Sequence, residues 1–295
     1  MRRLLFFSLC RVSTVCPERS VLGDKHPDRS WRDLPNFDIL IRTYNSSETI
    51  RDVLSGISSL SSQPSQIVVV DSGSTDDTVT ICKACGCSVY DYEGDVFNYS
   101  RSLNQGFRRV VSPYCLVLSS HVVIVRPDLV DRMFESMRVD DAKGVYVDFC
   151  RNDEGVTIID RNSFNGYNGL WNPCALYVTE LVESIGFDEV VPAAEDQHFA
   201  LRLFDMGYTT AALSGNWIHY LNPRISLKKD RNDYVSIAYF TFKKNLAMSN
   251  IFCIAKSALR NLAEFRFTIF YDRSALALRL LAARLRKPRF KSKYF

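Results

Sequence analysis

Short apolar runs alternate with helix-like segments between residues 37 and 119. The runs have the length of strands and are bounded by turn residues, and the segments between the first runs start with the Asn, Ser and Asp typical of helix N-termini. The predicted strands cover 37–42, 65–71, 87–92 and 114–119, and the predicted helices cover 45–60, 72–85 and 98–111. This alternation predicts an α/β fold with a mostly parallel sheet and right-handed crossovers.

The pattern loosens in the second half of the chain. A helix is predicted at 128–138, and two apolar segments at 144–150 and 155–161 indicate a hairpin or meander. The Gly- and Asn-rich loop that follows, 162–173, contains a tyrosine and a tryptophan and is long for a connection. We interpret it as a binding loop, because functional residues concentrate on such loops.

Length and composition suit one large domain with an appendage, since 295 residues with 46 % hydrophobic side chains can bury an ample core. We expect an N-terminal arm at 1–35, an α/β domain at 36–227 and a basic extension of helical period at 228–295. The arm contains a short apolar run after two arginines, but no clear signal-peptide cleavage site follows it. We therefore interpret it as a poorly ordered or loosely packed arm.

The net charge of +4 conceals an uneven distribution. Residues 251–295 contain eleven Lys or Arg and two acids, which leaves the first 250 residues with a charge of −5. Such a body is not a nucleic-acid binder by charge. Residues 274–290 place leucines and alanines on one helical face and arginines on another, which predicts peripheral contact with an anionic membrane. The alternative is that the apolar face packs onto the rest of the chain.

Hydropathy and cysteine content bear on the compartment. No apolar run approaches the roughly 18 to 20 residues of a membrane span. Nine cysteines, an odd number, indicate free thiols in a reducing compartment, and those in apolar runs are expected to be buried. These are Cys115, Cys150 and Cys253. We expect a cytoplasmic protein, at the inner face of a membrane if the tail binds lipid.

Cys82, Cys85 and Cys87 have a spacing that suggests zinc, but no fourth ligand is near in sequence.

Polar residues gather where three of the predicted strands end. They occupy Thr43 to Asn45, Asp71 to Ser74, and Ser119 to His121. In a parallel sheet, ligands bind beyond the carboxyl ends of the strands. These three segments therefore form the predicted binding edge.

Five segments in fixed order carry a family resemblance. They read "ILIRTYNSSETI", "IVVVDSGSTDDT", "YSRSLNQGF", "LVLSSHVVIVRPD" and "FDEVVPAAEDQHFALRLFDMGY", and together they resemble the family-2 glycosyltransferases over residues 36–222. The resemblance implies a GT-A fold. It also implies transfer of a sugar from a nucleotide-sugar donor to an acceptor hydroxyl, with inversion at the anomeric carbon. The expected acceptor is a growing saccharide or a lipid-linked one.

The resemblance implies a nucleotide site at the strand ends. Thr43, Tyr44 and Asn45 would offer backbone groups and an aromatic wall to the base. Asp71 would accept a hydrogen bond from a pyrimidine N–H or a ribose hydroxyl, and Arg101 would direct positive charge towards the diphosphate. The alternatives are a core position for Tyr44, a helix-capping role for Asp71 and a surface position for Arg101.

The metal site departs from the family pattern. Ser119 and His121 stand where the family carries an Asp-x-Asp motif that holds a divalent cation on the diphosphate. A histidine suits Mn²⁺ better than Mg²⁺, so the cofactor is predicted as Mn²⁺ or Mg²⁺ with His121 as ligand and Ser119 in the donor site. His121 could instead contact the diphosphate itself, or the site could be degenerate. His219 is a second candidate ligand.

Two adjacent acids supply the predicted chemistry. Asp196 matches the position of the family's general base, which takes the proton of the attacking hydroxyl, and Glu195 is its neighbour. Arg202, on the same predicted helix, is assigned to donor binding. The alternative for the acids is a helix-capping pair. The alternative functions are a degenerate glycosyltransferase that only binds sugars or partners, and a nucleotidyltransferase, which would need a Gly-rich signature near the first strand.

Overall fold

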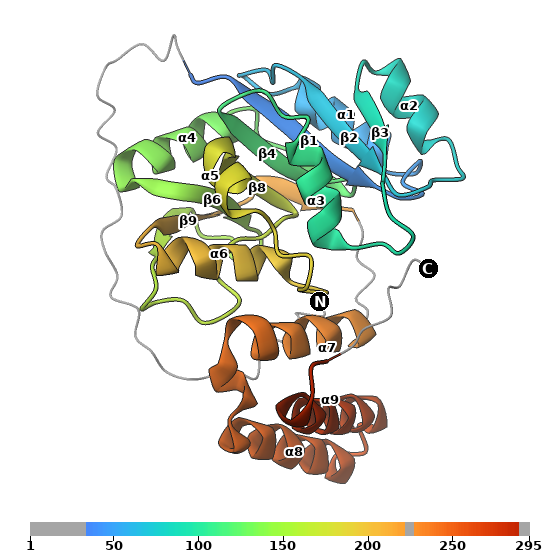
Figure 1. Ribbon diagram of the computed structural model, residues 1–295, viewed down its shortest axis with the longest axis vertical. Helices are drawn as coiled ribbons and strands as arrows, with labels where there is room; N and C mark the ends of the chain where they lie inside the picture. The colour runs from blue at the N-terminus through green and yellow to red at the C-terminus, as the bar shows by residue number, and fades with distance from the viewer. Residues whose placement is uncertain (1–33, 222–226, 289–295) are drawn as a thin grey trace. The chain divides into compact units, whose positions relative to one another are not determined.

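The computed structural model describes residues 34–221 and 227–288, which all lie within one unit of the chain, 33–295. Most of the predicted N-terminal arm, 1–35, lies outside the described residues. The predicted strands form the first half of an eight-stranded sheet in the order β3-β2-β1-β4-β8-β6-β9-β7 (Figure 1). The first four run parallel and are β3 (Ser88–Asp91), β2 (Ile67–Asp71), β1 (Phe37–Thr43) and β4 (Tyr114–Ser119). The predicted α/β fold is confirmed.

The second half of the sheet mixes strand directions. Strand β8 runs antiparallel to both β4 and β6, β6 runs parallel to β9, and β7 lies antiparallel to β9 at the edge. Their bounds are β6 (Ala142–Asp148), β7 (Gly155–Ile159), β8 (Cys174–Val178) and β9 (Thr209–Ser214). The predicted hairpin of 144–150 with 155–161 is wrong, because β9 lies between the two. Strand β6 is almost entirely buried and needs a partner on each side, whereas β7 is largely exposed and suits an edge.

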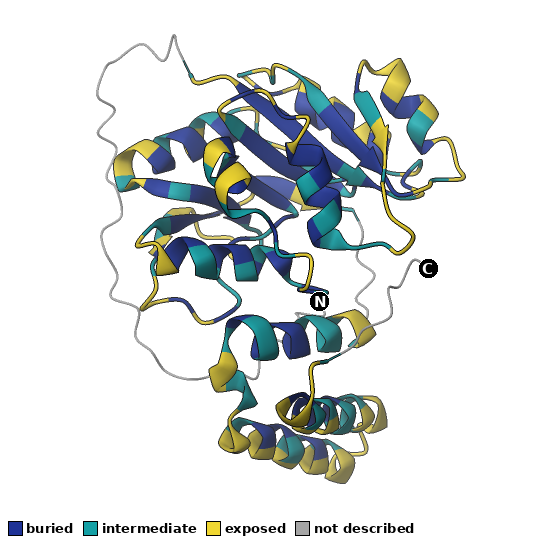
Figure 2. Ribbon diagram, viewed as in Figure 1, coloured by how far each residue is buried: buried dark blue, intermediate teal, exposed yellow. Residues whose placement is uncertain are grey.

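Helices cover both faces of the sheet. On β1, Ile39 and Ile41 belong to one apolar core and Leu40 to the other, as the alternation of side chains along a strand requires. The first core is closed by α1 (Ile50–Ser58), α2 (Thr78–Ala84) and α4 (Leu129–Asp140), and the second by α3 (Tyr99–Phe107), α5 (Thr179–Ile185) and α6 (Glu195–Asp205). Figure 2 shows the buried strands between the helices. Both faces of the central strands are therefore buried.

Helix α1 begins later than predicted, at Ile50 rather than near residue 45. Asn45 has a left-handed backbone with φ of 46°, and the N–H of Ser46 donates to Thr78 Oγ1 at 2.7 Å. The polar residues expected to cap the helix are therefore used to join the loop after β1 to the loop after β2.

A set of helices completes the described chain and confirms the predicted helical period. It comprises α7 (Leu227–Ser236), the π-helix η1 (Ile237–Thr241), the 3₁₀-helix η2 (Lys243–Leu246), α8 (Met248–Ala263) and α9 (Phe267–Leu285). Helices α8 and α9 form a hairpin with a short turn (Figure 1). Among the described residues no helix is long and apolar enough to cross a membrane.

The cysteines of residues 34–221 and 227–288 are free. Cys115 is buried as predicted and Cys150 is partly buried, but Cys253 is exposed on α8, so its predicted burial is wrong. The buried face of α8 is formed by Ile251, Ile254 and Ala258, and Cys253 points away from it. An apolar neighbourhood in sequence did not reveal which face of the helix is covered.

Candidate active site

The ends of three strands form the edge predicted to bind the nucleotide. Thr43 at the end of β1 pairs with Asp71 at the end of β2, and Arg42 pairs with Ser119 at the end of β4. Thr43 Oγ1 donates to Asp71 Oδ1 at 2.8 Å. The parallel register therefore brings Thr43, Asp71 and Ser119 to one edge, as the sequence predicts.

Asp71 is buried and accepts four hydrogen bonds. Besides Thr43, its donors are the N–H of Gly73 at 3.0 Å and both the N–H and the hydroxyl of Ser74, at 2.7 and 2.5 Å. Gly73 has φ of 85°, a conformation that side chains disfavour. Within the described structure the carboxylate thus holds the turn after β2. It does not cap α2, which begins at Thr78 with Asp77 in the N-cap position. Its contact with a donor remains a prediction.

The loop after β1 is tied to the same turn. The N–H of Asn45 donates to Ser74 Oγ at 2.8 Å, and Asn45 Oδ1 accepts from the N–H of Thr75 at 2.8 Å. Asn45 is exposed and Tyr44 is partly exposed beside it. Both side chains are accessible to a ligand on a loop whose backbone is fixed.

The two acids of α6 stand at its first turn and differ in exposure. Glu195 is buried, and its Oε1 lies 3.2 Å from Arg42 Nη1 and accepts from Asn172 Nδ2 at 3.0 Å. Asp196 is partly exposed, and its oxygens accept from the N–H groups of Asn172 and Gln197 at 3.1 and 2.8 Å. Asp196 is therefore the acid that a substrate can reach, and Glu195 is the one fixed inside.

Arg42 connects the strand edge to these acids. Besides Glu195, its Nη1 donates to the carbonyl of Tyr99 at 3.3 Å, and its guanidinium lies 5.4 Å from the centre of that ring. Only about a fifth of its side chain is exposed. The sequence reasoning missed Arg42, although one arginine in the apolar strand "FDILIRT" was a signal, because a buried guanidinium needs a charged partner.

Asn172 is the second residue that the sequence reasoning missed by name. It lies in the predicted binding loop, is buried, and accepts a hydrogen bond from the Tyr177 hydroxyl at 2.7 Å. Its side chain and backbone then reach Glu195 and Asp196 respectively. The loop thus contacts the predicted catalytic acids directly.

The surroundings of Asp196 raise its pKa to about 7. Burial is the largest cause and the negative charge of Glu195 is the second, while the two backbone N–H groups act in the opposite direction. A carboxylate that titrates near neutrality is suited to general base catalysis.

Helix α7 also takes part in this electrostatic environment. The charge of Asp233 contributes to the raised pKa of Asp196, and Lys229 Nζ lies 2.8 Å from Asp233 Oδ2. The hydroxyl of Ser236, at the end of α7, donates to the carbonyl of Ala193 at 2.6 Å, just before α6. Sequence spacing could not have linked these residues to α6, because the contact forms only in the folded chain.

Of the two predicted metal ligands, His219 lies in a small two-stranded sheet of β5 (Val122–Ile124) and β10 (Ile218–Tyr220), and His121 lies in the turn just before β5. His219 pairs with Val123, and the N–H of Leu221 donates to the carbonyl of His121 at 2.7 Å, so the two segments lie side by side. Thr49 Oγ1 lies 3.5 Å from His121 Nδ1. Two imidazoles could hold a transition metal, but in the described part of the chain no group of three His, Cys, Asp or Glu is placed to bind a cation. These side chains fit Mn²⁺ better than Mg²⁺, which prefers oxygen ligands.

Among the described residues, Cys82, Cys85 and Cys87 do not form part of any three-ligand group. Cys82 and Cys87 are buried, the N–H of Cys87 donates to the carbonyl of Cys82 at 3.1 Å, and Cys85 is exposed. Their contacts are those of helix-end packing.

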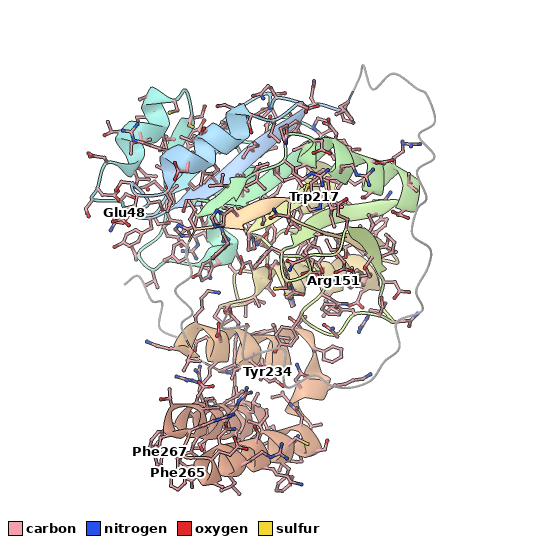
Figure 3. All side chains as sticks on the ribbon, turned by 180° about the vertical axis from the view of Figure 1, so that it is seen from behind. Glu48, Arg151, Trp217, Tyr234, Phe265 and Phe267 are labelled. Atoms are coloured by element: carbon pink, nitrogen blue, oxygen red, sulfur yellow. The ribbon has the colours of Figure 1, made fainter. Side chains whose placement is uncertain are left out.

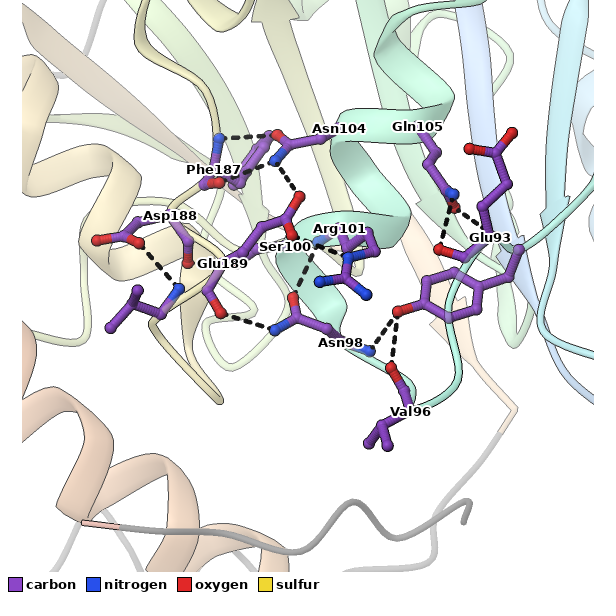
Figure 4. Close-up of polar contacts among 12 residues, drawn as sticks. Glu93, Val96, Asn98, Ser100, Arg101, Asn104, Gln105, Phe187, Asp188 and Glu189 are labelled. Carbon is purple, nitrogen blue, oxygen red and sulfur yellow. Dashed lines mark hydrogen bonds and ion pairs between the residues drawn. The ribbon is translucent and has the colours of Figure 1, made fainter. Parts of the chain in front are cut away.

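The two arginines assigned to the donor make their described contacts elsewhere. Arg101 Nε lies 2.8 Å from Glu189, in an exposed pair beside α3 (Figure 4). Arg202 Nη1 donates to the carbonyl of Gly186 at 3.0 Å, at the end of α5. Neither contact joins the strand edge to the acids, so donor binding by Arg101 and Arg202 remains a prediction.

Comparisons with known proteins show the family and the fold of the chain. The sequence profile of glycosyl transferase family 2 matches residues 38–190, and so ends before Glu195. A curated relative, the poly-β-1,6-N-acetyl-D-glucosamine synthase of Staphylococcus aureus, is 27 % identical over 124 residues. These are 41 % of this chain and 30 % of the relative, so the match spans less than a third of that protein.

Solved structures share the fold. The structure of S. aureus TarS 1–349 in complex with UDP has a TM-score of 0.54 at 19 % identity, over 77 % of this chain and 72 % of that one. The mannosyltransferase PcManGT of Pyrobaculum calidifontis, in complex with GDP-Man and Mn²⁺, has a TM-score of 0.59 at 15 % identity, over 88 % and 90 %. The profile match over half of the sequence and the shared GT-A fold place the chain in glycosyl transferase family 2.

Proposed function

We propose that this chain is an inverting glycosyltransferase that uses a nucleotide-sugar donor, with Asp196 as general base. The observation that carries the proposal is the setting of Asp196. It is partly exposed at the start of α6, held by two backbone N–H groups, and its pKa is raised to about 7. As a carboxylate it would accept the proton of the acceptor hydroxyl while that oxygen attacks the anomeric carbon and the nucleoside diphosphate leaves.

The strand edge is the proposed donor site. Tyr44 and Asn45 are accessible on a fixed loop, and Asp71 and Ser74 hold the adjacent turn. The TarS and PcManGT structures contain UDP and GDP-mannose, which supports a nucleoside diphosphate here. The synthase relative is named for a polysaccharide product, which supports a saccharide acceptor, free or lipid-linked.

The diphosphate needs positive charge, and two sources are proposed. Mn²⁺ held by His121 and His219 would neutralise the phosphate oxygens, as the presence of Mn²⁺ with GDP-mannose in PcManGT supports. Lys229 is the second source, because its ammonium interacts electrostatically with Tyr99 and Glu195 and more than half of its side chain is exposed. A nucleoside diphosphate entering the site could draw this ammonium away from Asp233.

Donor hydrolysis tests the proposal without knowledge of the acceptor. The purified chain is incubated with a panel of UDP- and GDP-sugars, with and without Mn²⁺, and the release of free nucleotide is followed. We expect slow release from one donor, and none from that donor with Asp196→Asn. Inversion is then read from the anomeric configuration of the product once an acceptor is found. Binding of UDP or GDP without any turnover would favour the alternative, a degenerate glycosyltransferase that only binds.

A further inference from the structure

Exposed apolar residues concentrate on the α8–α9 hairpin. On α9 they recur at intervals of three, four or seven residues, which places them on one helical face. This face consists of Phe267, Tyr271, Leu278, Leu281 and Leu285, and side chains on it are 38 to 89 % exposed. A second face of the same helix, with Leu276 and Leu280, is buried. Helix α9 is thus apolar on two sides, and only one of them is covered.

Helix α8 repeats this arrangement. Ile251, Ile254 and Ala258 are buried, while Phe252 and Leu259, seven residues apart, are 66 and 64 % exposed. A surface helix of a protein that is covered only by water is normally polar on its outer face. The exposed faces of both helices therefore indicate a partner with an apolar interior.

The turn between the helices exposes an aromatic ring at a conformational cost. The N–H of Arg266 donates to the carbonyl of Asn261, and that of Phe265 to the carbonyl of Leu262, which is the Schellman arrangement of a helix C-terminus. The left-handed position of this motif usually holds glycine, but here it holds Phe265, with φ of 56°. Phe265 is 79 % exposed, and Phe267 lies beside it (Figure 3). The strained residue gains little packing within the chain.

The same hairpin is rich in exposed positive charge. The exposed basic residues of the hairpin and its end are Lys256, Arg260, Arg266, Arg284, Arg286 and Lys287. Of the two acids in this region, Glu264 pairs with Arg266, and Asp272 pairs with Arg231 of α7. The hairpin therefore exposes both apolar and positively charged side chains, and a complementary surface is apolar and negatively charged.

We propose that the α8–α9 hairpin docks on the surface of an anionic lipid bilayer. Phe265 and Phe267 enter the interface at the tip, the exposed leucines lie against the acyl boundary, and the lysines and arginines contact the lipid phosphates. The docking face differs from the one that the periodicity of 274–290 suggests, because Leu276 and Leu280 are already packed inside. A second copy of this chain is the competing partner for the same face.

Sedimentation with vesicles tests the proposal on the full chain. Vesicles of phosphatidylcholine alone are compared with vesicles of equal phosphatidylcholine and phosphatidylglycerol. We expect the chain to sediment with the anionic vesicles only, and less so as salt rises, because the attraction is screened. Equal recovery in the supernatant with both vesicles, or equal binding to both, overturns the proposal.

Two variants separate docking from folding. Phe265→Asn removes the ring and suits a left-handed backbone, so it does not endanger the fold. Together with Phe267→Ser it should weaken vesicle binding at least about tenfold, since a buried aromatic ring is worth more than a factor of ten. The control is Val111→Ser, which removes an 81 % exposed side chain outside the hairpin and should change nothing. Undiminished vesicle binding by the double variant refutes the role of the tip. Light scattering that shows a dimer for the wild type and a monomer for the double variant assigns the face to a second copy and refutes the lipid assignment.

Discussion

The α/β body and the α8–α9 hairpin use apolar residues in opposite ways. In the body, β1 buries Ile39 and Ile41 on one side and Leu40 on the other, so both faces of the sheet are closed. In the hairpin, α9 buries Leu280 but leaves its neighbour Leu281 38 % exposed. The hairpin thus exposes a group of apolar side chains on an element that carries none of the proposed catalytic residues. The difference suggests that catalysis and attachment to a membrane surface reside in separate parts of the chain.

The largest expected effect is a loss of catalytic turnover in the α/β body that leaves the hairpin unaffected. Asp196→Asn should lower turnover at least about a hundredfold, the usual worth of a general base, while binding of UDP or GDP and of anionic vesicles stays unchanged. The measurement is product formation under single-turnover conditions, beside a binding titration. Asp205→Asn, an exposed acid on the same helix, is the matched control and should retain wild-type turnover. Turnover retained by Asp196→Asn would move the role of base to another residue, with Glu195 the next candidate.

The second prediction concerns stability at the edge between β1 and α6. Arg42→Met leaves the buried carboxylate of Glu195 without its cation, so the free energy of unfolding should fall by about 2 to 3 kcal/mol, somewhat below the loss for a fully buried pair. The double variant Arg42→Met, Glu195→Gln should recover most of the loss, because no unpaired charge remains. Urea denaturation measures both. Equal losses in the single and double variants would contradict an electrostatic origin.

The third prediction sharpens the assignment of charge at the diphosphate. Lys229→Met should weaken binding of the nucleoside diphosphate about tenfold and leave binding of the nucleoside alone unchanged, which is the effect of one lost charge-assisted contact. Calorimetry with and without Mn²⁺ measures both affinities. Lys228→Met, the exposed neighbour, is the control. If Lys229→Met loses affinity for the nucleoside as well, the lysine supports the structure of the site and not the charge of the ligand.

The fourth prediction is a pH dependence with opposite signs for activity and stability. Because the pKa of Asp196 is raised to about 7, turnover should be about a tenth of its plateau at pH 6 and reach the plateau above pH 8. The folded state holds this proton more tightly than the unfolded chain does, where an aspartate titrates near 4. The contribution of Asp196 to stability is therefore fully present below about pH 4 and is lost as the pH rises through about 7. A rate that is flat between pH 6 and 8 would contradict the raised pKa.

Much of the fold follows from sequence, and the exceptions share a cause. The alternation of strands and helices from 37 to 119 predicts β1 to β4 in parallel, because each short connection leaves little choice of partner. The pairing of β6 and β7 with β9 could not be predicted, since β9 lies far along the chain. Local patterns indicate which segments are strands, and long-range packing determines which strands are neighbours.

The candidate site divides in the same way. Thr43, Asp71 and Ser119 could be placed together from sequence because the ends of parallel strands meet at one edge. Asn172, Lys229 and Asp233 could not be linked to Asp196, because their contacts depend on a loop and a helix whose paths no local period describes. The sequence assigned Arg101 to the diphosphate, whereas the described arginine next to the acids is Arg42.

The smallest predicted effect is a gain in stability from a change at the hairpin tip. Phe265 occupies a left-handed position at which an L-residue with a bulky side chain is disfavoured by about 1 to 2 kcal/mol and asparagine is disfavoured less. The variant Phe265→Asn gives up an edge contact with Phe267, whose ring centre lies 6.3 Å away, but little other packing, since the ring is 79 % exposed. We therefore expect the free energy of unfolding to rise by about 0.5 kcal/mol, measured by urea denaturation. In the body, removal of a core ring such as Phe199 should instead lower it by about 3 to 5 kcal/mol. A loss of stability in Phe265→Asn would show that the ring packs within the chain, and would remove the argument that its strain is retained for a partner.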